Sequence, residues 1–304
     1  MERNNPYFNQ VKLLVQVLPY IKKYDCFALK GGTAINFFLR ELPRLSVDID
    51  LVYVPLDERE KALSNIDNAL RNIIEDLERA ISALSISKTY LHNTNKLIKF
   101  IIHLNNANVK VEVSPVLRGT VSGIIEKDVS RKVQEMFGFA SANLSSFEDI
   151  YAGKICAALD RQHPRDLFDV KILLDCEGIT EKLFGVFIVY LISCNRPIAE
   201  LLESSTLDLA DAYRLDFEGM SSLSVSLEYL LKTRERLKFE INERLNDRYK
   251  EFLMSFKYGN PKWDLLNLPN VENFPAIKWK QYNLDKMSKV KRETAIRKLE
   301  KVLG

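Results

Sequence analysis

The 304-residue chain lacks the features that mark several classes of protein. Its longest stretch without a charged side chain is 183–195, shorter than the roughly 20 apolar residues that span a bilayer. No basic segment followed by an apolar one stands at its start, so we expect no secretory signal. The four cysteines and three histidines are scattered, which argues against a zinc site and a disulfide-rich fold. We expect a cytoplasmic protein without membrane contact.

Composition and length indicate a globular protein of two domains. Hydrophobic residues make up 46% of the chain and charged residues 28%, and no internal repeat is visible. A chain of this length suits two domains of roughly 150 residues each. The net charge is only +3, which by itself says nothing about nucleic acid.

Basic side chains are concentrated near the C-terminus. From Lys278 to Gly304 there are nine Lys and Arg against three acids, so this segment carries +6 and the rest of the chain −3. Such a segment is either a solvated helix end or a surface that binds phosphate. Aromatic residues in the same region fit either stacking on bases or simple core packing. The sequence leaves both questions open.

Hydrophobic patterning divides the chain near residue 140. Before it, apolar runs and period-two alternation predict strands at 27–29, 46–53, 97–104 and 109–113, and helical periodicity covers 1–24, 34–39 and 57–84. After it, a capping-box pattern over 145–148 precedes a predicted helix that reaches about residue 161. Further helices are predicted at 165–174, 183–194, 201–209 and 222–256. We predict an α+β fold, with a mixed sheet and helices over 1–140 and an all-helical domain over 141–304.

Two aspartates point to metal chemistry. Asp48 and Asp50 are two positions apart on a predicted strand, so both side chains project from one face while Ile49 faces the core. Paired carboxylates repel each other unless a cation joins them, and Mg²⁺ prefers oxygen ligands that it shares with phosphates. Glu112, on a strand of similar alternation, would complete a two-metal clamp. The alternative is a solvated edge strand for the aspartates and an exposed position for Glu112.

A glycine turn precedes these aspartates. Gly31, Gly32 and Thr33 follow a short predicted strand and open a helix, where free backbone N–H groups and the helix dipole favour phosphate. The segment lacks the spacing of a P-loop or a dinucleotide fingerprint, and alone it is often just a turn. With Asp48 and Asp50 on the next strand, it would bring phosphate-binding groups and metal ligands to one sheet edge. This layout resembles that of polymerase-β-type nucleotidyltransferases.

A third group of polar residues lies on two predicted helices. Lys154 and Arg161 are seven residues apart, or two helical turns, and therefore share a face. Asp166 falls in the first turn of the next helix, where Arg165 and Asp169 stand at i, i+4 spacing. Those last two residues could simply form a salt bridge on the helix surface, worth less than about 1 kcal/mol.

These motifs, in this order, resemble those of the AbiEii/AbiGii toxin nucleotidyltransferases. The resemblance rests on segments 30–33, 45–50, 154–161 and 165–169, and on a closing stretch over 274–284. It implies a two-domain nucleotidyltransferase fold and Mg²⁺-dependent transfer of a nucleotide from an NTP. It also implies an RNA acceptor, foremost the tRNA 3′ end, and a toxin role in a toxin–antitoxin or phage-defence system with an antitoxin encoded nearby.

With this resemblance, we assign roles to three groups of residues. The nucleotide would be bound by Lys30, Gly31, Gly32, Thr33 and Ser46. The metal would be bound by Asp48, Asp50 and Glu112. Catalysis would fall to Asp48, Glu112, Lys154, Arg161, Asp166 and Asp169. In this scheme Lys154 neutralises charge on the phosphates with help from Arg161, the two later aspartates complete the cleft or orient Lys154, and Glu112 is either a metal ligand or a base.

Three other classes fit parts of the pattern. An enzyme that adds a nucleotide or a phosphate to a protein hydroxyl would use the same donor site. A sugar-nucleotide glycosyltransferase also uses an Asp-x-Asp pair with a metal, but it would not need the glycine turn and helix. A nucleotide- or RNA-binding module without catalysis is disfavoured, because every expected acid and lysine is present.

Overall fold

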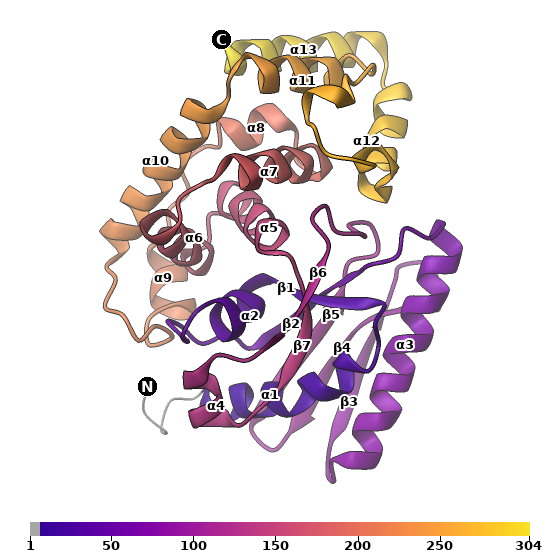
Figure 1. The fold of residues 1–304 in the computed structure, drawn as a ribbon, viewed down its shortest axis with the longest axis vertical. Helices are drawn as coiled ribbons and strands as arrows, with labels where there is room; N and C mark the ends of the chain where they lie inside the picture. The colour runs from indigo at the N-terminus through magenta and orange to yellow at the C-terminus, as the bar shows by residue number, and fades with distance from the viewer. Residues whose placement is uncertain (1–6) are drawn as a thin grey trace. The chain divides into compact units, whose positions relative to one another are not determined.

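A seven-stranded mixed sheet is the framework of the first part of the chain (Figure 1). The computed structural model describes residues 7–304, and the chain divides into two units. The first unit ends at Ile150 and also takes in 217–224, and the second holds 151–216 and 225–304. The domain boundary at residue 140 stays a prediction.

Strand order in the sheet is β3-β4-β5-β2-β1-β7-β6. The strands are β1 (Phe27–Lys30), β2 (Asp48–Tyr53), β3 (Ser85–Tyr90), β4 (Leu97–Leu104), β5 (Ala107–Val113), β6 (Ile124–Asp128) and β7 (Ser141–Ser145). The pairs β2/β5 and β1/β7 are parallel, and the other neighbours are antiparallel. The predicted α+β fold with a mixed sheet is confirmed.

Helices α1 (Phe8–Lys22) and α3 (Arg59–Ala80) supply apolar faces that pack on the sheet. α1 contacts β5 and β7, α3 contacts β4, and the two helices also touch each other. Buried residues recur in α3 at the three- and four-residue spacing of an amphipathic helix: Ile66, Leu70, Ile73, Ile74 and Leu77. These helices correspond to those predicted over 1–24 and 57–84, and residues 1–6 lie outside the described residues.

Four elements of this unit have no counterpart in the predictions: β3, β6, β7 and α4 (Arg131–Phe137). β3 and β6 are the two edges of the sheet, and their residues are almost all exposed. An edge strand with both faces in water shows no apolar alternation, so its sequence carries no strand signal. The helix predicted over 34–39 also differs, because α2 (Gly31–Ala34) continues as a π-helix, η1 (Ile35–Leu39).

Every regular element described within 151–216 and 225–304 is helical. They are α5 (Phe147–Asp160, which begins in the first unit), α6 (Pro164–Cys176), α7 (Glu181–Ser193), α8 (Ile198–Leu202), α9 (Ala210–Asp216), α10 (Leu227–Arg244), α11 (Asp247–Lys257), η2 (Trp263–Leu265), η3 (Val271–Asn273), α12 (Pro275–Asp285) and α13 (Lys289–Leu303). α6 packs on α10, α7 on α12, and α13 on both α8 and α11. None of the described helices is long and apolar enough to cross a bilayer.

Two helix predictions in this unit are wrong in their boundaries. The helix predicted over 222–256 is split into α10 and α11, because the Asn246 side chain accepts a hydrogen bond from the Tyr249 backbone N–H and so caps a new helix. The segment predicted as a helix over 201–209 instead joins the end of α8 to the start of α9.

Ser146 and Asp149 fix the start of α5, one residue later than the predicted capping box. Ser146 Oγ accepts a hydrogen bond from the Asp149 N–H at 3.1 Å and donates to its carboxylate at 2.7 Å. The same buried carboxylate accepts the backbone N–H groups of Val121 and Ser122, both at 2.8 Å. The capping box therefore lies one residue later than predicted and also ties α5 to the loop before β6.

Asp149→Asn replaces a buried charged acceptor by an amide that can accept at only one of its two ends. We expect the free energy of unfolding to fall by about 2 kcal/mol, because backbone N–H groups lose their partner in the interior. Urea denaturation measures this change. Glu78→Gln, at an exposed position of α3, is the control and should change stability by less than about 0.5 kcal/mol. Equal stability of the two variants would contradict the role given to Asp149.

Candidate active site

The glycine turn lies directly against the aspartate strand. Gly31 has a φ of +72°, and a Cβ there would stand 2.7 Å from Oδ2 of Asp50. At Gly32 a Cβ would stand 2.6 Å from a guanidinium nitrogen of Arg44 and 3.1 Å from Oγ of Ser46. A side chain at either position would have to displace these neighbours, and at Gly31 the left-handed backbone also favours glycine.

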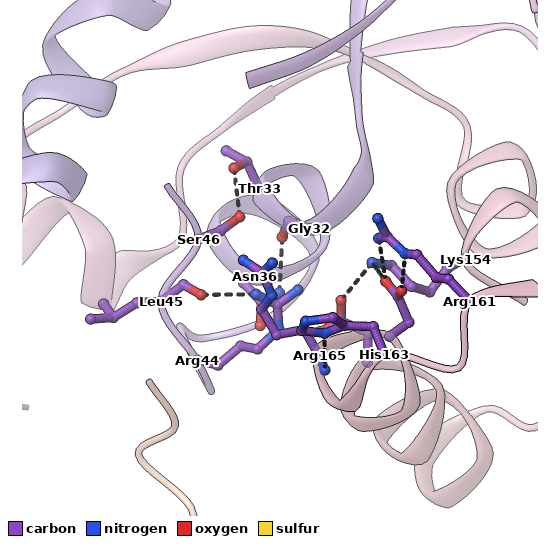
Figure 2. Close-up of polar contacts among 12 residues, drawn as sticks. Gly32, Thr33, Asn36, Arg44, Leu45, Ser46, Lys154, Arg161, His163 and Arg165 are labelled. Carbon is purple, nitrogen blue, oxygen red and sulfur yellow. Dashed lines mark hydrogen bonds and ion pairs between the residues drawn. The ribbon is translucent and has the colours of Figure 1, made fainter. Parts of the chain in front are cut away.

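Thr33 fastens the same turn to the segment that leads into β2. Its Oγ1 donates a hydrogen bond to the backbone oxygen of Asp48 at 2.5 Å and lies 2.9 Å from Oγ of Ser46 (Figure 2). The side chains of Thr33 and Ser46 are both buried, and Lys30 enters the turn in extended conformation. The structure thus gathers the residues predicted to bind the nucleotide, and that role stays a prediction.

The residues predicted to bind metal stand on two neighbouring strands. In the parallel pair β2/β5, Asp48 lies beside Lys110 and Asp50 lies beside Glu112. Side chains of paired residues project from the same face of a sheet, so the three carboxylates share one face with Lys110. The Lys110 Nζ lies 3.4 Å from Oε2 of Glu112 and 3.8 Å from Oδ2 of Asp48.

Lysines therefore flank the carboxylates along the sheet. Besides Lys110, the register sets Lys30 beside Asp50 across β1/β2, and Lys99 beside Glu112 across β4/β5. Positive charges on neighbouring strand positions offset part of the repulsion between the carboxylates. Lys110 has no place in the predicted site, although the alternation of β5 puts it on the same face as Glu112, two positions away.

Arg44 is a second residue absent from the predicted site. Its side chain is buried, and its Nη1 donates to the backbone oxygen of Leu45 at 2.8 Å (Figure 2). Another of its guanidinium nitrogens faces Gly32, as described above. A buried arginine leaves no periodic signal in a single sequence, because arginine is ordinarily exposed.

Asp48 and Asp50 offer the oxygen ligands that Mg²⁺ prefers. Asp48 and Glu112 side chains are 34% and 43% exposed, and Asp50 is intermediate, so a hydrated cation could reach their oxygens. Among residues 7–304, no group of three or more His, Cys, Asp or Glu is arranged to hold a metal ion. Asp48 and Asp50 would hold Mg²⁺ together with phosphate oxygens, and Glu112 stays a predicted third ligand.

The second unit holds a buried network of charges. The Lys154 Nζ lies 2.8 Å from Oδ1 of Asp166 and 3.0 Å from Oδ2 of Asp169. Arg161 adds a two-point contact to Asp166, with its Nε at 2.6 Å from Oδ2 and its Nη2 at 3.0 Å from Oδ1. In Figure 2, dashed lines join the side chains of Lys154 and Arg161 to carboxylate oxygens that lie near both. The structure thus brings together the four residues of this group that were predicted to take part in catalysis: Lys154, Arg161, Asp166 and Asp169.

Burying these charged side chains costs free energy of hydration, which their mutual contacts have to offset. Lys154 is 6% exposed and the two aspartate side chains are essentially inaccessible, whereas Arg161 is largely exposed. Burial opposes ionisation of Asp166, but the Lys154 ammonium and the Arg161 guanidinium outweigh it and hold the pKa of Asp166 well below its usual range. Removing one member of such a network leaves an uncompensated buried charge.

The alternative that Arg165 and Asp169 form a salt bridge on a solvated helix surface is wrong, because Asp169 does not lie on the surface. Asp169 is fully buried and pairs with Lys154, so it does not lie on a solvated helix face. The start of α6 is instead capped by His163, whose Nδ1 accepts a hydrogen bond from the Arg165 backbone N–H at 3.1 Å. Burial and the neighbouring Arg165 guanidinium lower the pKa of His163, which favours the neutral ring that can accept this bond.

Solved structures include proteins to which this chain is similar. The chain is similar to MenT4, a nucleotidyltransferase toxin from Mycobacterium tuberculosis H37Rv, with a TM-score of 0.52 and 13% identity over 98% of this chain and 95% of that one. It is also similar to JHP933 from Helicobacter pylori, with a TM-score of 0.47 and 16% identity over 78% of this chain and 93% of that one. At 13% identity, the likeness to MenT4 speaks for the fold alone.

Sequence comparison then gives the family. The family model of the nucleotidyl transferase AbiEii toxin of type IV toxin–antitoxin systems matches residues 12–279. The match covers most of the chain, which therefore belongs to the AbiEii family of nucleotidyltransferase toxins. Membership implies an NTP substrate and an antitoxin partner. Among curated proteins, none matches this chain.

Gly31→Ala combines backbone strain with a clash against Asp50, whereas Gly178→Ala provides the strain alone. Gly178 has a φ of +69°, and a Cβ there would meet no heavy atom within 4 Å. We expect Gly178→Ala to cost about 1 kcal/mol of unfolding free energy and Gly31→Ala about 1–2 kcal/mol more. Urea denaturation of the two variants measures the difference. Equal costs would show that the turn does not press on Asp50.

Asp166→Asn should lower the free energy of unfolding at pH 7 by about 3 kcal/mol, because Lys154 stays buried with one partner fewer. Asp175→Asn is a matched control: Asp175 also contacts one lysine and one arginine, both at 2.7 Å, but is one-third exposed. The control should cost less than about 1 kcal/mol.

The same pair of proteins tests the pKa of Asp166. A depressed pKa in the folded state means that ionised Asp166 stabilises the fold above its usual pKa of 3.8, and that this stabilisation is lost as the pH falls below that value. The stability gap between the parent chain and Asp166→Asn should thus be constant near neutral pH and narrow on acidification below 3.8. A gap that widens in acid would contradict the assigned direction.

Proposed function

We propose that this toxin transfers a nucleotide from an NTP to an RNA acceptor, foremost the 3′ end of tRNA, with Mg²⁺, and that its antitoxin is encoded nearby. The observation that carries the proposal is the packing of the Gly31–Gly32 turn onto Asp50, beside Asp48 and Glu112 on the same sheet face. The backbone that we expect to bind phosphate and the carboxylates that we expect to bind metal belong to the same unit of the protein.

The donor would lie across the glycine turn. Its triphosphate accepts hydrogen bonds from backbone N–H groups at the start of the helical segment 31–39, and Lys30 and Ser46 supply further polar contacts. The absence of side chains at Gly31 and Gly32 lets phosphate oxygens approach this backbone. Thr33 keeps the turn in place through its bond to the Asp48 backbone.

The three carboxylates would act at the phosphate group that reacts, through metal binding and proton transfer. Asp48 and Asp50 would hold Mg²⁺, which when bound offsets the negative charge of the triphosphate and favours pyrophosphate as leaving group. Glu112 is either a third ligand or the base that takes the proton from the acceptor hydroxyl. The acceptor oxygen then forms a bond to the α-phosphorus, and the bond from that phosphorus to pyrophosphate breaks.

The buried network of the second unit has a proposed role in the same reaction. Asp166 and Asp169 fix the Lys154 ammonium, and Asp166 also fixes the Arg161 guanidinium in a two-point contact. Lys154 would neutralise charge that builds on the phosphates, with assistance from Arg161, whose exposed side chain can contact solute. Asp166 and Asp169 are then positioning residues for these two cations.

An incubation of the purified protein with each α-labelled NTP, Mg²⁺, and either total cellular RNA or total protein tests the proposal. Label on RNA is the expected result. Label on protein would replace RNA by a protein hydroxyl as the acceptor, and transfer of a labelled sugar from a sugar nucleotide would indicate a glycosyltransferase. Binding of NTP without any transfer would leave a non-catalytic module.

Asp48→Asn should abolish nucleotide transfer, with at least a 100-fold loss expected from the removal of one metal ligand, on the order of 3 kcal/mol of barrier. Its stability should stay within about 1 kcal/mol of the parent chain, because Asp48 is one-third exposed and its ion pair with Lys110 is long, at 3.8 Å. Glu60→Gln, an exposed acid on α3, is the control.

The readouts are the initial rate of RNA labelling and the urea midpoint. Full activity of Asp48→Asn would contradict the metal assignment, whereas an inactive and unfolded variant would show that Asp48 is structural.

A further inference from the structure

An exposed column of rings and charge stands on α12, away from the residues discussed so far. Trp279 and Tyr282 are 52% and 47% exposed, and their rings stack at 5.6 Å between centroids with planes 22° apart. The Lys286 Nζ lies 4.2 Å from the centroid of the Tyr282 ring, so cation and rings follow one another along the helix. We call Trp279, Tyr282 and Lys286 the aromatic column.

These rings are not part of the protein core. α12 buries its other face through Ala276, Ile277 and Leu284. Two large stacked rings left in water lose hydrophobic stabilisation that burial would give. The aromatic column is therefore an exposed feature beyond what packing of α12 requires.

Positive charge accompanies the aromatic column. Between Lys278 and Lys298 there are eight basic side chains and two acidic ones. Burial lowers the pKa of Lys257, on the neighbouring α11, and the Arg292 guanidinium lowers it further. Burial also lowers the pKa of Lys280, and Lys257 adds to that effect. These cations thus repel one another, and an anion bound among them would relieve the repulsion.

A cavity of about 290 Å³ lies beside this charge. It is lined mainly by apolar side chains of α8 and α13, together with Met287, which directly follows the aromatic column. Three lysines also line it, Lys257, Lys291 and Lys298, against one acid, Glu200. Lys257 is half-buried, and no acid among the described residues forms an ion pair with it. The column and these three lysines form what we call the α12–α13 surface.

We propose that the α12–α13 surface binds a single-stranded segment of the RNA acceptor, with bases stacked on the aromatic column and phosphates held by Lys257, Lys291 and Lys298. This inference rests on the proposed function only for its choice of RNA as the acceptor. Stacking on aromatic rings is open to any unpaired base, and lysines bind the phosphates that link successive bases. An acidic protein would satisfy the lysines but gives no reason for exposed, mutually stacked rings.

The test measures binding without NTP, so that it is independent of nucleotide transfer. The probe is a fluorescein-labelled single-stranded RNA of mixed sequence, followed by fluorescence anisotropy from about 50 to 200 mM salt. A blunt RNA duplex and poly-glutamate are the comparison probes. The variants are Trp279→Ala with Tyr282→Ala, Trp279→Phe with Tyr282→Phe, and Lys291→Met with Lys298→Met. Phe239→Ala, on α10, is the control for loss of an exposed ring, because Phe239 is 64% exposed.

We expect the double alanine variant to raise the Kd for the single strand about tenfold or more, and the double phenylalanine variant to restore most of this loss. The lysine variant should reduce the slope of log K against log salt by about 0.7 for each lysine removed. Phe239→Ala should bind as the parent chain does. Circular dichroism melting of every variant verifies that α12 stays folded, and the phenylalanine variant keeps the test decisive if the alanine variant melts early.

An unchanged Kd and salt slope in the alanine and lysine variants would overturn the inference. So would equally tight binding of poly-glutamate, since it would show recognition of charge alone. A parent chain that binds RNA through these residues yet labels only protein would leave the α12–α13 surface standing and overturn RNA as acceptor. If the parent chain labels RNA but the variants bind RNA normally, RNA stands as the acceptor and the role of the α12–α13 surface is overturned.

Discussion

Repulsion between carboxylates on one sheet face is the constraint around which the candidate donor site is built. Asp50 and Glu112 are neighbours in the β2/β5 register, and Asp48 lies two positions away from Asp50. The Lys110 ammonium stands between Asp48 and Glu112 and offsets part of their charge. The glycine turn closes on Asp50 because it carries no Cβ. A carboxylate face that needs a cation, beside a bare backbone turn, is suited to a metal-bound triphosphate.

The second unit also holds neighbouring carboxylates that would repel each other, but there they lie in the protein interior. Two buried aspartates share Lys154, and Arg161 contacts Asp166 from the solvent side. In the low dielectric of the interior these charges hold one another in fixed positions, at the cost of their hydration. An enzyme that handles phosphates gains from cations that do not have to reorganise during the reaction. The membership in the AbiEii family agrees with this emphasis on phosphate chemistry.

Much of the fold could be predicted from the sequence, because its central elements are patterned. The alternation of Asp48, Ile49 and Asp50 predicted β2, and the apolar spacing of α3 predicted that helix. The edge strands β3 and β6 could not be predicted, since their exposed residues carry no alternation. At the candidate site, the motifs predicted residues that the structure brings together within each unit, but they did not predict Lys110 or Arg44. The register that sets Lys110 beside Asp48 and the burial of Arg44 depend on tertiary packing, which a single sequence does not show.

The most direct test of the account is the RNA of cells in which this toxin is produced without its antitoxin. Mass spectrometry of RNA 3′ ends, compared with cells producing Asp48→Asn, measures the reaction where the acceptor is not chosen in advance. The account predicts added nucleotide mass on RNA, with tRNA 3′ ends foremost, in cells with the parent chain and none with the variant. Unmodified RNA in both, with nucleotide found on protein, would contradict it.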